Sequence, residues 1–238
     1  MQAIILAGGK GTRLRPYTTS FPKPLMPIDD LPILEIVVRQ LARAGFDRLI
    51  VTTGHLAELI RVFCGDGGKW GVRIEYSHEE EPLGTAGPLS LVQDRLDENF
   101  LVMNGDLLTT MDYRKAFETH VASKAMATIS LYQRDVKIDF GVVEEEPAGQ
   151  LGRYIEKPTL SYNVSMGINF FNRGALRYME PGKRLDIPDL MMRLKQAGER
   201  VACARQDCYW LDIGRTDDYA VATDEFQKRR EQFLPRHG

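Results

Sequence analysis

The alternation of short apolar runs with amphipathic stretches in the first half of the chain constrains its fold most strongly. Apolar runs of strand length lie at 3–7, 48–53, 72–77 and 100–104. Helices are expected between them, at 33–44, 55–63 and 85–96, and the acidic residues and proline of 29–32 are predicted to start the first. Strands and helices that alternate in this way form βαβ units. We therefore expect an α/β fold around a mostly parallel sheet.

The pattern changes after about residue 125. Strand-like runs follow one another at 127–133, 140–145, 154–156 and 164–171, and helices are expected again only at 187–197 and 216–230. Successive strands without helices between them indicate hairpins. We expect the second half to add a mixed or antiparallel layer. One domain over 1–238 is expected, because no repeat, low-complexity tract or long linker separates the halves.

The bulk composition restricts the partners. The chain has 238 residues, 43% of them hydrophobic, and a formal net charge of −2. Nothing global attracts nucleic acid or an anionic membrane, so any basic site must be local. No run of about 18 apolar residues occurs, and the three cysteines have no metal-like spacing and fit a reducing compartment. We expect a cytoplasmic protein with no nucleic-acid or membrane partner.

A glycine-rich loop follows the first predicted strand, with Gly8, Gly9 and Gly11. Glycines at a strand end let backbone N–H groups approach an anion closely, as in phosphate sites. Two common loops are excluded. A Walker A loop needs Gly-Lys-Ser/Thr at a fixed distance, which this stretch lacks, and the G-x-G-x-x-G dinucleotide motif needs glycine where the chain has Leu14. A different phosphate site or a plain turn remains.

Two basic residues accompany this loop. Arg13 can hold phosphate oxygens in a bidentate manner, whereas Lys23 supplies a point charge. Prolines at 22 and 24 restrict the backbone on both sides of Lys23 and favour extended geometry, so we expect this lysine to be held in place. An arginine and a rigidly mounted lysine beside a glycine loop favour a polyphosphate ligand over a solvated turn.

Two carboxylates follow predicted strands or adjoin glycines. Asp106 comes directly after the run 100–104, in Asn104-Gly105-Asp106, and Asp212 lies in the glycine-containing stretch 210–214. A carboxylate at the carboxyl end of a strand points into the crevice where open α/β sheets bind ligands. Mg²⁺ prefers one or two carboxylates together with phosphate and water oxygens. Taken alone, Asn-Gly-Asp is more often a simple turn, so a metal site here is a hypothesis.

These elements together resemble the sugar-1-phosphate nucleotidyltransferases, the nucleotide-sugar pyrophosphorylases. The loop reads G-G-x-G-T-R-L-x-P followed by P-K-P. Later stretches match in order and rough spacing as far as about Tyr219, at 81–87, 104–106, 140–143, 155–158 and 210–214. The chain is most similar to short mannose-1-phosphate guanylyltransferase-type members without a C-terminal hexapeptide β-helix, since it stops about 20 residues after Asp218.

The resemblance implies a fold and a division of labour along the chain. The fold would be a Rossmann-like three-layer α/β/α arrangement with a mostly parallel mixed central sheet. Nucleotide binding would fall to about 1–124 and sugar-phosphate binding to about 125–220, with a C-terminal helix at about 216–230.

The resemblance also assigns roles to single residues. It implies Arg13, Lys23 and Asp106 as catalytic residues, and Asp106 with Asp212 as ligands of Mg²⁺. The nucleotide-binding residues that it implies are Leu6, Ala7, Gly8, Gly9, Gly11, Thr12, Gly84, Thr85 and Gly105. Those that it implies for the sugar phosphate are Gly141, Glu156, Lys157, Gly167 and Asn169. In this assignment Lys157 holds the phosphate and Glu156 the sugar hydroxyls.

The implied activity is transfer of a nucleoside monophosphate from a nucleoside triphosphate to a hexose or heptose 1-phosphate, with Mg²⁺ and release of pyrophosphate. The L-G-T-A-G form of 83–87 favours GTP. Ser165 departs from the Asn-Ala-Gly that mannose-specific members commonly have, which argues against mannose.

Three alternatives remain open. The chain is also compatible with uridylyl or thymidylyl transfer to glucose-type or N-acetylmuramic acid 1-phosphates, and with transfer to a phosphocholine-type acceptor. The third is a non-catalytic sensor of nucleotide sugars, which would be expected to have lost charged residues that this chain retains. A homodimer is compatible with the sequence.

Overall fold

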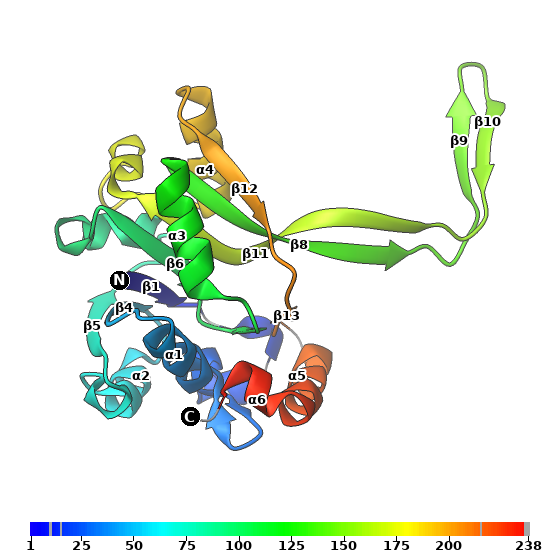
Figure 1. Cartoon of the computed structure of the whole chain (residues 1–238). Coiled ribbons are helices and arrows are strands. Elements are labelled where there is room, and N and C mark those ends of the chain that lie inside the picture. Colours follow the sequence, from blue (N-terminus) through cyan, green and yellow to red (C-terminus); the bar gives the residue numbers. More distant parts are fainter. Residues whose placement is uncertain (10, 15, 215, 236–238) are drawn as a thin grey trace.

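A seven-stranded sheet in the order β12-β8-β11-β6-β1-β4-β5 forms the centre of the protein (Figure 1). This computed structural model describes residues 1–9, 11–14, 16–214 and 216–235. The strands of the sheet are β1 (Gln2–Ala7), β4 (Arg48–Thr53), β5 (Arg73–His78), β6 (Asn99–Asn104), β8 (Ala127–Lys137), β11 (Thr159–Asn172) and β12 (Val201–Arg205). Strand β11 is antiparallel to both of its neighbours, and the other pairs of the sheet are parallel. The expected mostly parallel mixed sheet is confirmed.

Helices cover both faces of the sheet because successive strand residues point to opposite sides. On the face of Ile5, the apolar stripes of α1 (Ile33–Arg43), α2 (Ala57–Cys64) and α3 (Tyr113–Ser123) are buried. On the face of Ile4 lie α4 (Ile187–Gln196) and the short 3₁₀ segments η5 (Gly87–Leu91) and η7 (Arg173–Tyr178). The result is the three-layer α/β/α arrangement that the resemblance implied.

A third apolar cluster attaches the end of the chain to the region after the glycine loop. Helices α5 (Thr216–Lys228) and α6 (Arg230–Phe233) bury Phe226 and Phe233 against Leu14 and Ile28. The small strands of this region are β2 (Pro27–Ile28), β3 (Leu31–Pro32), β7 (Leu107–Thr109) and β13 (Trp210–Asp212). The remaining 3₁₀ segments are η1 (Thr12–Leu14), η2 (Tyr17–Thr19), η3 (Lys23–Leu25), η4 (Gly68–Trp70) and η6 (Gln93–Arg95).

Two helix predictions are wrong in part. The stretch 85–96 forms η5 and η6 instead of one α-helix, because Pro88 has no N–H to donate and the N–H of Gly87 donates to the Leu185 carbonyl at 3.0 Å. The acidic residues of 29–32 do not cap α1, which begins at Ile33 behind Pro32. Asp29 instead has φ of 58° in the turn between β2 and β3, where it and Asp30 pair with Arg230.

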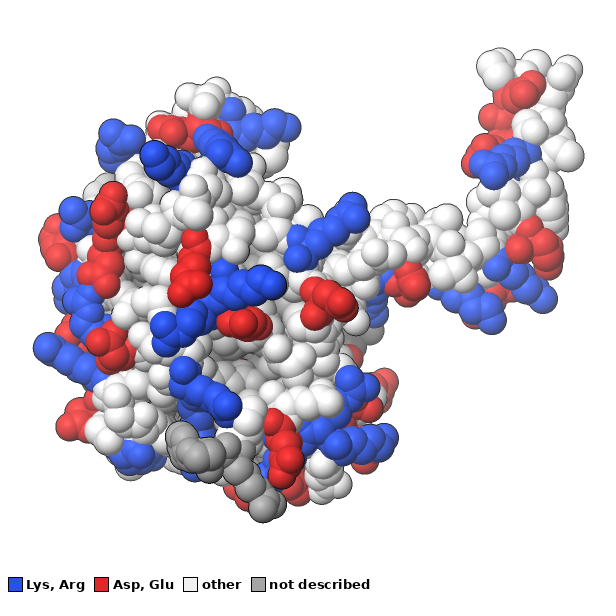
Figure 2. Space-filling model, in the orientation of Figure 1, with Lys and Arg blue, Asp and Glu red and all other residues white. Residues whose placement is uncertain are grey.

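The second half of the chain does not form a separate layer, because its strands extend the same sheet. Strands β8 and β11 continue beyond the sheet as a two-stranded ribbon, which ends in the hairpin of β9 (Val142–Glu146) and β10 (Gln150–Ile155). We call residues 132–164 the arm. Figures 1 and 2 show the arm projecting from the body of the molecule. Among the described residues, no helix is long and apolar enough to cross a membrane.

We expect Phe171→Ala to lower the free energy of unfolding by about 3–5 kcal/mol, the usual cost of emptying a buried aromatic site. Phe171 is fully buried and stacks on Phe100 with ring centroids 6.0 Å apart. Urea unfolding at one fixed protein concentration measures the change. Val62→Ala is the control, because Val62 is 82% exposed and its truncation should change stability by no more than about 0.5 kcal/mol. Equal effects of the two substitutions would contradict this packing.

Candidate active site

A cavity of about 410 Å³ opens where the carboxyl ends of β1, β4 and β6 lie side by side. Strand β1 lies between β4 and β6 while the chain reaches them in opposite directions across the sheet, so this is the switch point at which open α/β sheets bind ligands. We call it the strand-end cavity. The predicted residues that line it are Leu6, Ala7, Gly8, Gly9, Gly11, Thr12, Arg13, Lys23, Gly84, Thr85 and Asp106. Gly105 lies beneath it, with its N–H donating to the Leu6 carbonyl at 3.0 Å.

The glycine loop is held by its own backbone. The carbonyl of Gly11, which has φ of 60°, accepts from the N–H of Leu14 at 2.9 Å and from the hydroxyl of Thr18 at 2.7 Å. Leu14 is buried and anchors η1, while the neighbouring Arg13 is exposed at the cavity. A Cβ atom placed on Gly214 would lie 3.6 Å from a guanidinium nitrogen of Arg13. The loop therefore presents its arginine beside the stretch that carries Asp212.

Lys23 is rigid, but its backbone is not extended as predicted. Pro22 is extended, and Lys23 then begins the 3₁₀ turn η3. The carbonyls of Pro22 and Lys23 accept hydrogen bonds from Leu25 at 2.9 Å and Met26 at 3.1 Å. The ammonium group of Lys23 pairs with Oδ2 of Asp106, and the side chains of the two residues are only 11% and 20% exposed. The turn thus places the lysine against the end of β6.

The two predicted metal ligands come together through strand pairing. Strand β13 pairs antiparallel with β7, with Asp212 opposite Leu107, and the N–H of Ile213 donates to the Asp106 carbonyl at 3.2 Å. Protein atoms enclose the Asp212 carboxyl on one side although much of its surface reaches water. This partial desolvation raises its pKa, and the nearby Asp106 carboxylate raises it further, while Lys23 and Arg13 oppose the change.

The donor set fits a magnesium ion that completes its shell with phosphate and water. Oδ1 of Asp106 is buried and has no hydrogen-bond partner among the described residues, which is costly unless a ligand satisfies it. No group of three or more His, Cys, Asp and Glu side chains that could hold a metal occurs in the described part of the chain. Mg²⁺ needs no such group, because it is commonly bound by one or two carboxylates together with substrate phosphates.

Glu79 lies in the strand-end cavity and was not predicted to be there. The sequence places it in the acidic run 79–81, which favours a solvated loop. Its Oε2 accepts from the N–H of Leu83 at 3.0 Å, and a Cβ atom on Gly8 would lie 2.6 Å from its Oε1. Partial burial raises the pKa of this carboxyl, which the hydrogen bond from Leu83 only partly offsets. Its position directly after β5 is the signal by which it could have been found.

The loop that includes Gly84 and Thr85 is fixed to the start of α4. The N–H of Thr85 donates to Oδ1 of Asp186 at 3.0 Å, and the Thr85 hydroxyl accepts from the N–H of Ile187 at 2.8 Å. Gly84 has φ of 80°, and a Cβ atom there would lie 2.6 Å from the Leu185 carbonyl oxygen. This wall of the cavity is therefore held against a segment 101 residues further along the chain.

The five residues assigned to the sugar phosphate separate into two groups. Gly167 has φ of 69°, and its Cβ position would lie 2.7 Å from Nδ2 of Asn104, which lines the strand-end cavity. Asn169 is buried in β11 close by. Gly141, Glu156 and Lys157 lie in the arm instead, where Lys157 and Glu156 form an exposed ion pair at 3.9 Å. One chain does not bring these three residues to its own cavity.

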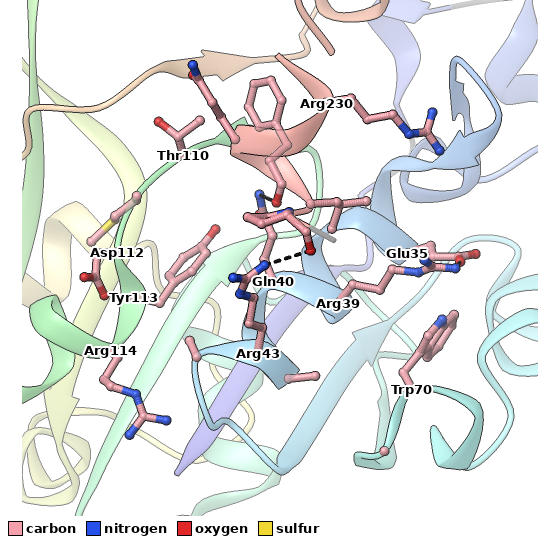
Figure 3. Close-up of a pocket in the computed structure, with 18 of the residues that line it drawn as sticks. Glu35, Arg39, Gln40, Arg43, Trp70, Thr110, Asp112, Tyr113, Arg114 and Arg230 are labelled. Carbon is pink, nitrogen blue, oxygen red and sulfur yellow. Dashed lines mark hydrogen bonds and ion pairs between the residues drawn. The ribbon is translucent and has the colours of Figure 1, made fainter. Parts of the chain in front are cut away.

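A second, larger cavity of about 1060 Å³ contains none of the predicted residues. Figure 3 shows Arg39, Arg43, Arg114 and Arg230 around it. The end of the described chain forms part of its wall, because Arg43 donates to the Pro235 carbonyl at 2.9 Å. The predicted residues that converge do so at the strand-end cavity, which is therefore the candidate active site.

Comparison with known protein families shows which family this chain belongs to. Residues 2–229 match the family described as Nucleotidyl transferase. The chain therefore belongs to the nucleotidyl transferase family, and the resemblance seen in the sequence is confirmed.

Curated relatives carry related names. The chain is 35% identical to a UTP–glucose-1-phosphate uridylyltransferase of Synechocystis sp., over 92% of this chain and 61% of that protein. It is 34% identical to a mannose-1-phosphate guanylyltransferase catalytic subunit beta of Xenopus tropicalis, over 92% and 62%. It spans about three fifths of the length of these relatives. A D-glycero-alpha-D-manno-heptose 1-phosphate guanylyltransferase of Aneurinibacillus thermoaerophilus is 32% identical over 95% of this chain and 99% of its own length.

Solved structures share the fold. A putative glucose-1-phosphate thymidylyltransferase from Bacillus anthracis, in complex with a sucrose, superposes with a TM-score of 0.78 at 26% identity and covers 98% of both chains. HddC from Yersinia pseudotuberculosis, complexed with GMP-PN, has a TM-score of 0.73 at 24% identity over 94% of this chain and 99% of its own, which shows the fold alone.

We expect Glu79→Gln to make the protein more stable at pH 8 but not at pH 4.5. Since burial raises the pKa of Glu79, the folded state binds its proton more tightly than the unfolded chain. The stability due to this carboxyl is thus present at low pH and lost as the pH rises through the raised pKa. Glutamine removes that loss while keeping an acceptor for Leu83, for a gain of up to about 1 kcal/mol. Urea unfolding at both pH values measures it, with the exposed Glu81→Gln as control; a variant less stable than wild type at pH 8 would refute the burial argument.

Proposed function

We propose that this protein transfers a guanylyl group from GTP to a hexose or heptose 1-phosphate, giving a GDP-sugar and pyrophosphate. The observation that carries the proposal is the convergence of Arg13, Lys23, Asp106 and Asp212 around one strand-end cavity lined by a glycine loop. Three segments far apart in the sequence, around residues 13–23, 106 and 212, bring two cations and two carboxylates together there. Such a set suits a triphosphate and its metal ion, and it is what the family resemblance assigns to the reaction.

The residues act by positioning and by neutralising charge. An oxygen of the sugar phosphate attacks the α-phosphorus of the triphosphate as the bond to pyrophosphate breaks. This nucleophile is already ionised, so no strong general base is needed. Arg13 holds the β- and γ-phosphates, and the fixed ammonium of Lys23 faces the charge that develops around the α-phosphorus. Placed charges of this kind are effective because they need not reorganise during the reaction.

Asp106 and Asp212 would hold Mg²⁺, which when bound neutralises phosphate charge and orients both reactants. The unpartnered Oδ1 of Asp106 supports this assignment. Its Oδ2 stays with Lys23, so the same carboxylate serves both the cation site and the lysine. The raised pKa of Asp212 makes protonation of this ligand compete with the metal as the pH falls.

Glu79 supports guanine as the base. Guanine presents two adjacent donors, N1–H and the N2 amino group, and one carboxylate can accept from both. Uracil presents a single N–H between two carbonyl acceptors, which a carboxylate repels. Oε1 of Glu79 lies beside Gly8 in the same cavity as the predicted base loop at Gly84 and Thr85. The relatives named guanylyltransferases are consistent with this choice, and the relative named a uridylyltransferase is the reason to test it.

A sensor of nucleotide sugars is the rival function, and one assay separates the two. The full chain is incubated with Mg²⁺ and each pairing of GTP, UTP, dTTP, CTP and ATP with mannose, glucose, glucosamine, heptose and N-acetylmuramic acid 1-phosphates, and pyrophosphate release is measured. Turnover that is greatest with GTP supports the proposal. If turnover is greatest with another nucleotide, the assignment of guanine is wrong. If no pair of substrates gives turnover, the result favours the sensor.

We expect Lys23→Met to lower kcat by roughly 10²–10³-fold, the usual effect of removing one preplaced charge. Methionine keeps the apolar stem of the side chain and removes the ammonium that pairs with Asp106. Lys115→Met, on the exposed side of α3, is the matched control and should retain wild-type turnover. Near-normal kcat for Lys23→Met in the pyrophosphate assay would show that the lysine is not catalytic.

We expect Glu79→Gln to lower kcat/KM for GTP by about 10- to 100-fold, because glutamine offers one acceptor and one donor to the two donors of guanine. The value for UTP should change much less. Both are measured with the best sugar phosphate from the grid, and Glu81→Gln serves as the control. Equal losses with GTP and UTP would remove Glu79 from base recognition.

A further inference from the structure

The arm is fixed in a direction that leads away from its own cavity. Seven residue pairs join β8 and β11 from the base of the arm outward, beginning with Ser165 opposite Leu131 just before the arm and ending with Thr159 opposite Lys137. At its base the ring of Tyr132 packs on Trp210 at 5.4 Å, and the indole N–H of Trp210 donates to the Met166 carbonyl at 2.9 Å. Folding the arm back at its base would separate Tyr132 from Trp210. At about 3.3 Å per residue, the six steps from Ser165 to Thr159 carry the chain roughly 20 Å outward.

The arm carries residues that the strand-end cavity lacks. Glu156 and Lys157 follow β10, and Gly141 precedes β9. Of the described residues that line the cavity, none belongs to the arm. Among the described residues, the cations that line the cavity are Arg13 and Lys23, which are both assigned to the triphosphate. The lysine and the glutamate that the resemblance assigns to the acceptor are therefore absent from the described part of a single chain's own site.

The arm carries a concentration of large apolar side chains that are exposed to solvent. Six of the fourteen large hydrophobic side chains that are exposed among the described residues lie in it, namely Val136, Phe140, Val143, Leu151, Tyr154 and Tyr162. Phe140 is 79% exposed. An isolated two-stranded ribbon is at best marginally stable, and concentrated exposed apolar residues mark interaction surfaces. The arm therefore has the properties of a docking element.

A surface complementary to the arm lies beside the cavity. Tyr17 and Phe21 are 59% and 44% exposed, on the segment between Arg13 and Lys23. Arg13, at the start of this segment, is exposed, whereas β9 ends in the exposed acidic run 144–146. Exposed aromatic residues beside an exposed arginine suit the aromatic residues and the acidic run of the arm, since complementary charge fixes orientation and partner.

We propose that the arm of one copy docks beside the strand-end cavity of a second copy and places Glu156 and Lys157 at its mouth. The exchange is reciprocal, so a two-fold dimer contains two complete sites, each built from the body of one copy and the arm of the other. Lys157 then binds the phosphate of the acceptor, and Glu156 its hydroxyl groups. The inference rests on the proposed function for these roles but not for the docking itself.

A mixed dimer tests which copy supplies the arm. Lys23→Met disables the body and Lys157→Met disables the arm, and each variant alone should lose nearly all turnover. In a dimer of the two variants, the body of the Lys157→Met copy meets the intact arm of the Lys23→Met copy. Random pairing at equal amounts restores about a quarter of wild-type sites, because half of the dimers are mixed and each has one good site. The two chains are co-expressed with different tags, and pyrophosphate release is measured.

Recovery to about a quarter supports arm exchange, and no recovery in dimers shown to be mixed means that each arm serves its own chain, which overturns it. Sedimentation velocity provides a readout independent of turnover. The wild type should sediment as a dimer and Phe140→Asp as a monomer, while Val62→Asp, which changes an exposed residue of α2, stays dimeric. A monomeric wild type, or a dimer unaffected by Phe140→Asp, refutes the docking. A dimer that responds to Phe140→Asp but releases no pyrophosphate with any substrate pair refutes the proposed function alone.

Discussion

The ion pair between Lys23 and Asp106 is the contact on which the arrangement of the site depends. It joins the turn after the glycine loop to the end of β6, and both side chains are mostly removed from water. A charge left alone in such a position is expensive, so each partner is tolerated because the other is present. The neighbouring residues serve this pairing: Pro22 and Pro24 fix the backbone of the lysine, and Gly105 lets β6 pass close to β1. The proposed triphosphate and its metal ion would then meet a pair whose charges are already balanced.

Much of the fold could be predicted from local pattern, and what could not depends on distant contacts. The run 48–53 is β4 to the residue, because a strand between two parallel neighbours is buried on both faces and its centre, Leu49–Val51, is continuously apolar. The helix predicted at 85–96 does not form, because the N–H groups of Ala86 and Gly87 donate to the carbonyl of Leu185. Leu185 lies about a hundred residues further along the chain, so no local sequence pattern reveals this contact. Helix α3 was not predicted because its buried side is narrow; its start is instead fixed by Asp112, whose side chain accepts from Lys115 at 2.9 Å.

The residues of the candidate site likewise divide into those that local sequence defines and those that distant contacts place. The glycine loop and Lys23 could be found because short-range chemistry defines them. Glu79 was missed because three consecutive glutamates favour a solvated loop, although the first of them ends up against Gly8. The place of Lys157 in space was beyond prediction, since it depends on how far β11 stays paired with β8 and on the contact of Tyr132 with Trp210 that aims the ribbon.

The pairing of β13 with β7 joins residues about a hundred positions apart, with Asp212 opposite Leu107. Contacts of such long sequence separation close late in folding, because the entropy of the intervening chain must be lost first. During synthesis the glycine loop, Lys23 and Asp106 leave the ribosome well before Asp212. A nascent chain therefore presents the glycine loop before β13 can pair with β7. The arrangement of Lys23, Asp106 and Asp212 is thus complete only when nearly the whole chain has been synthesised.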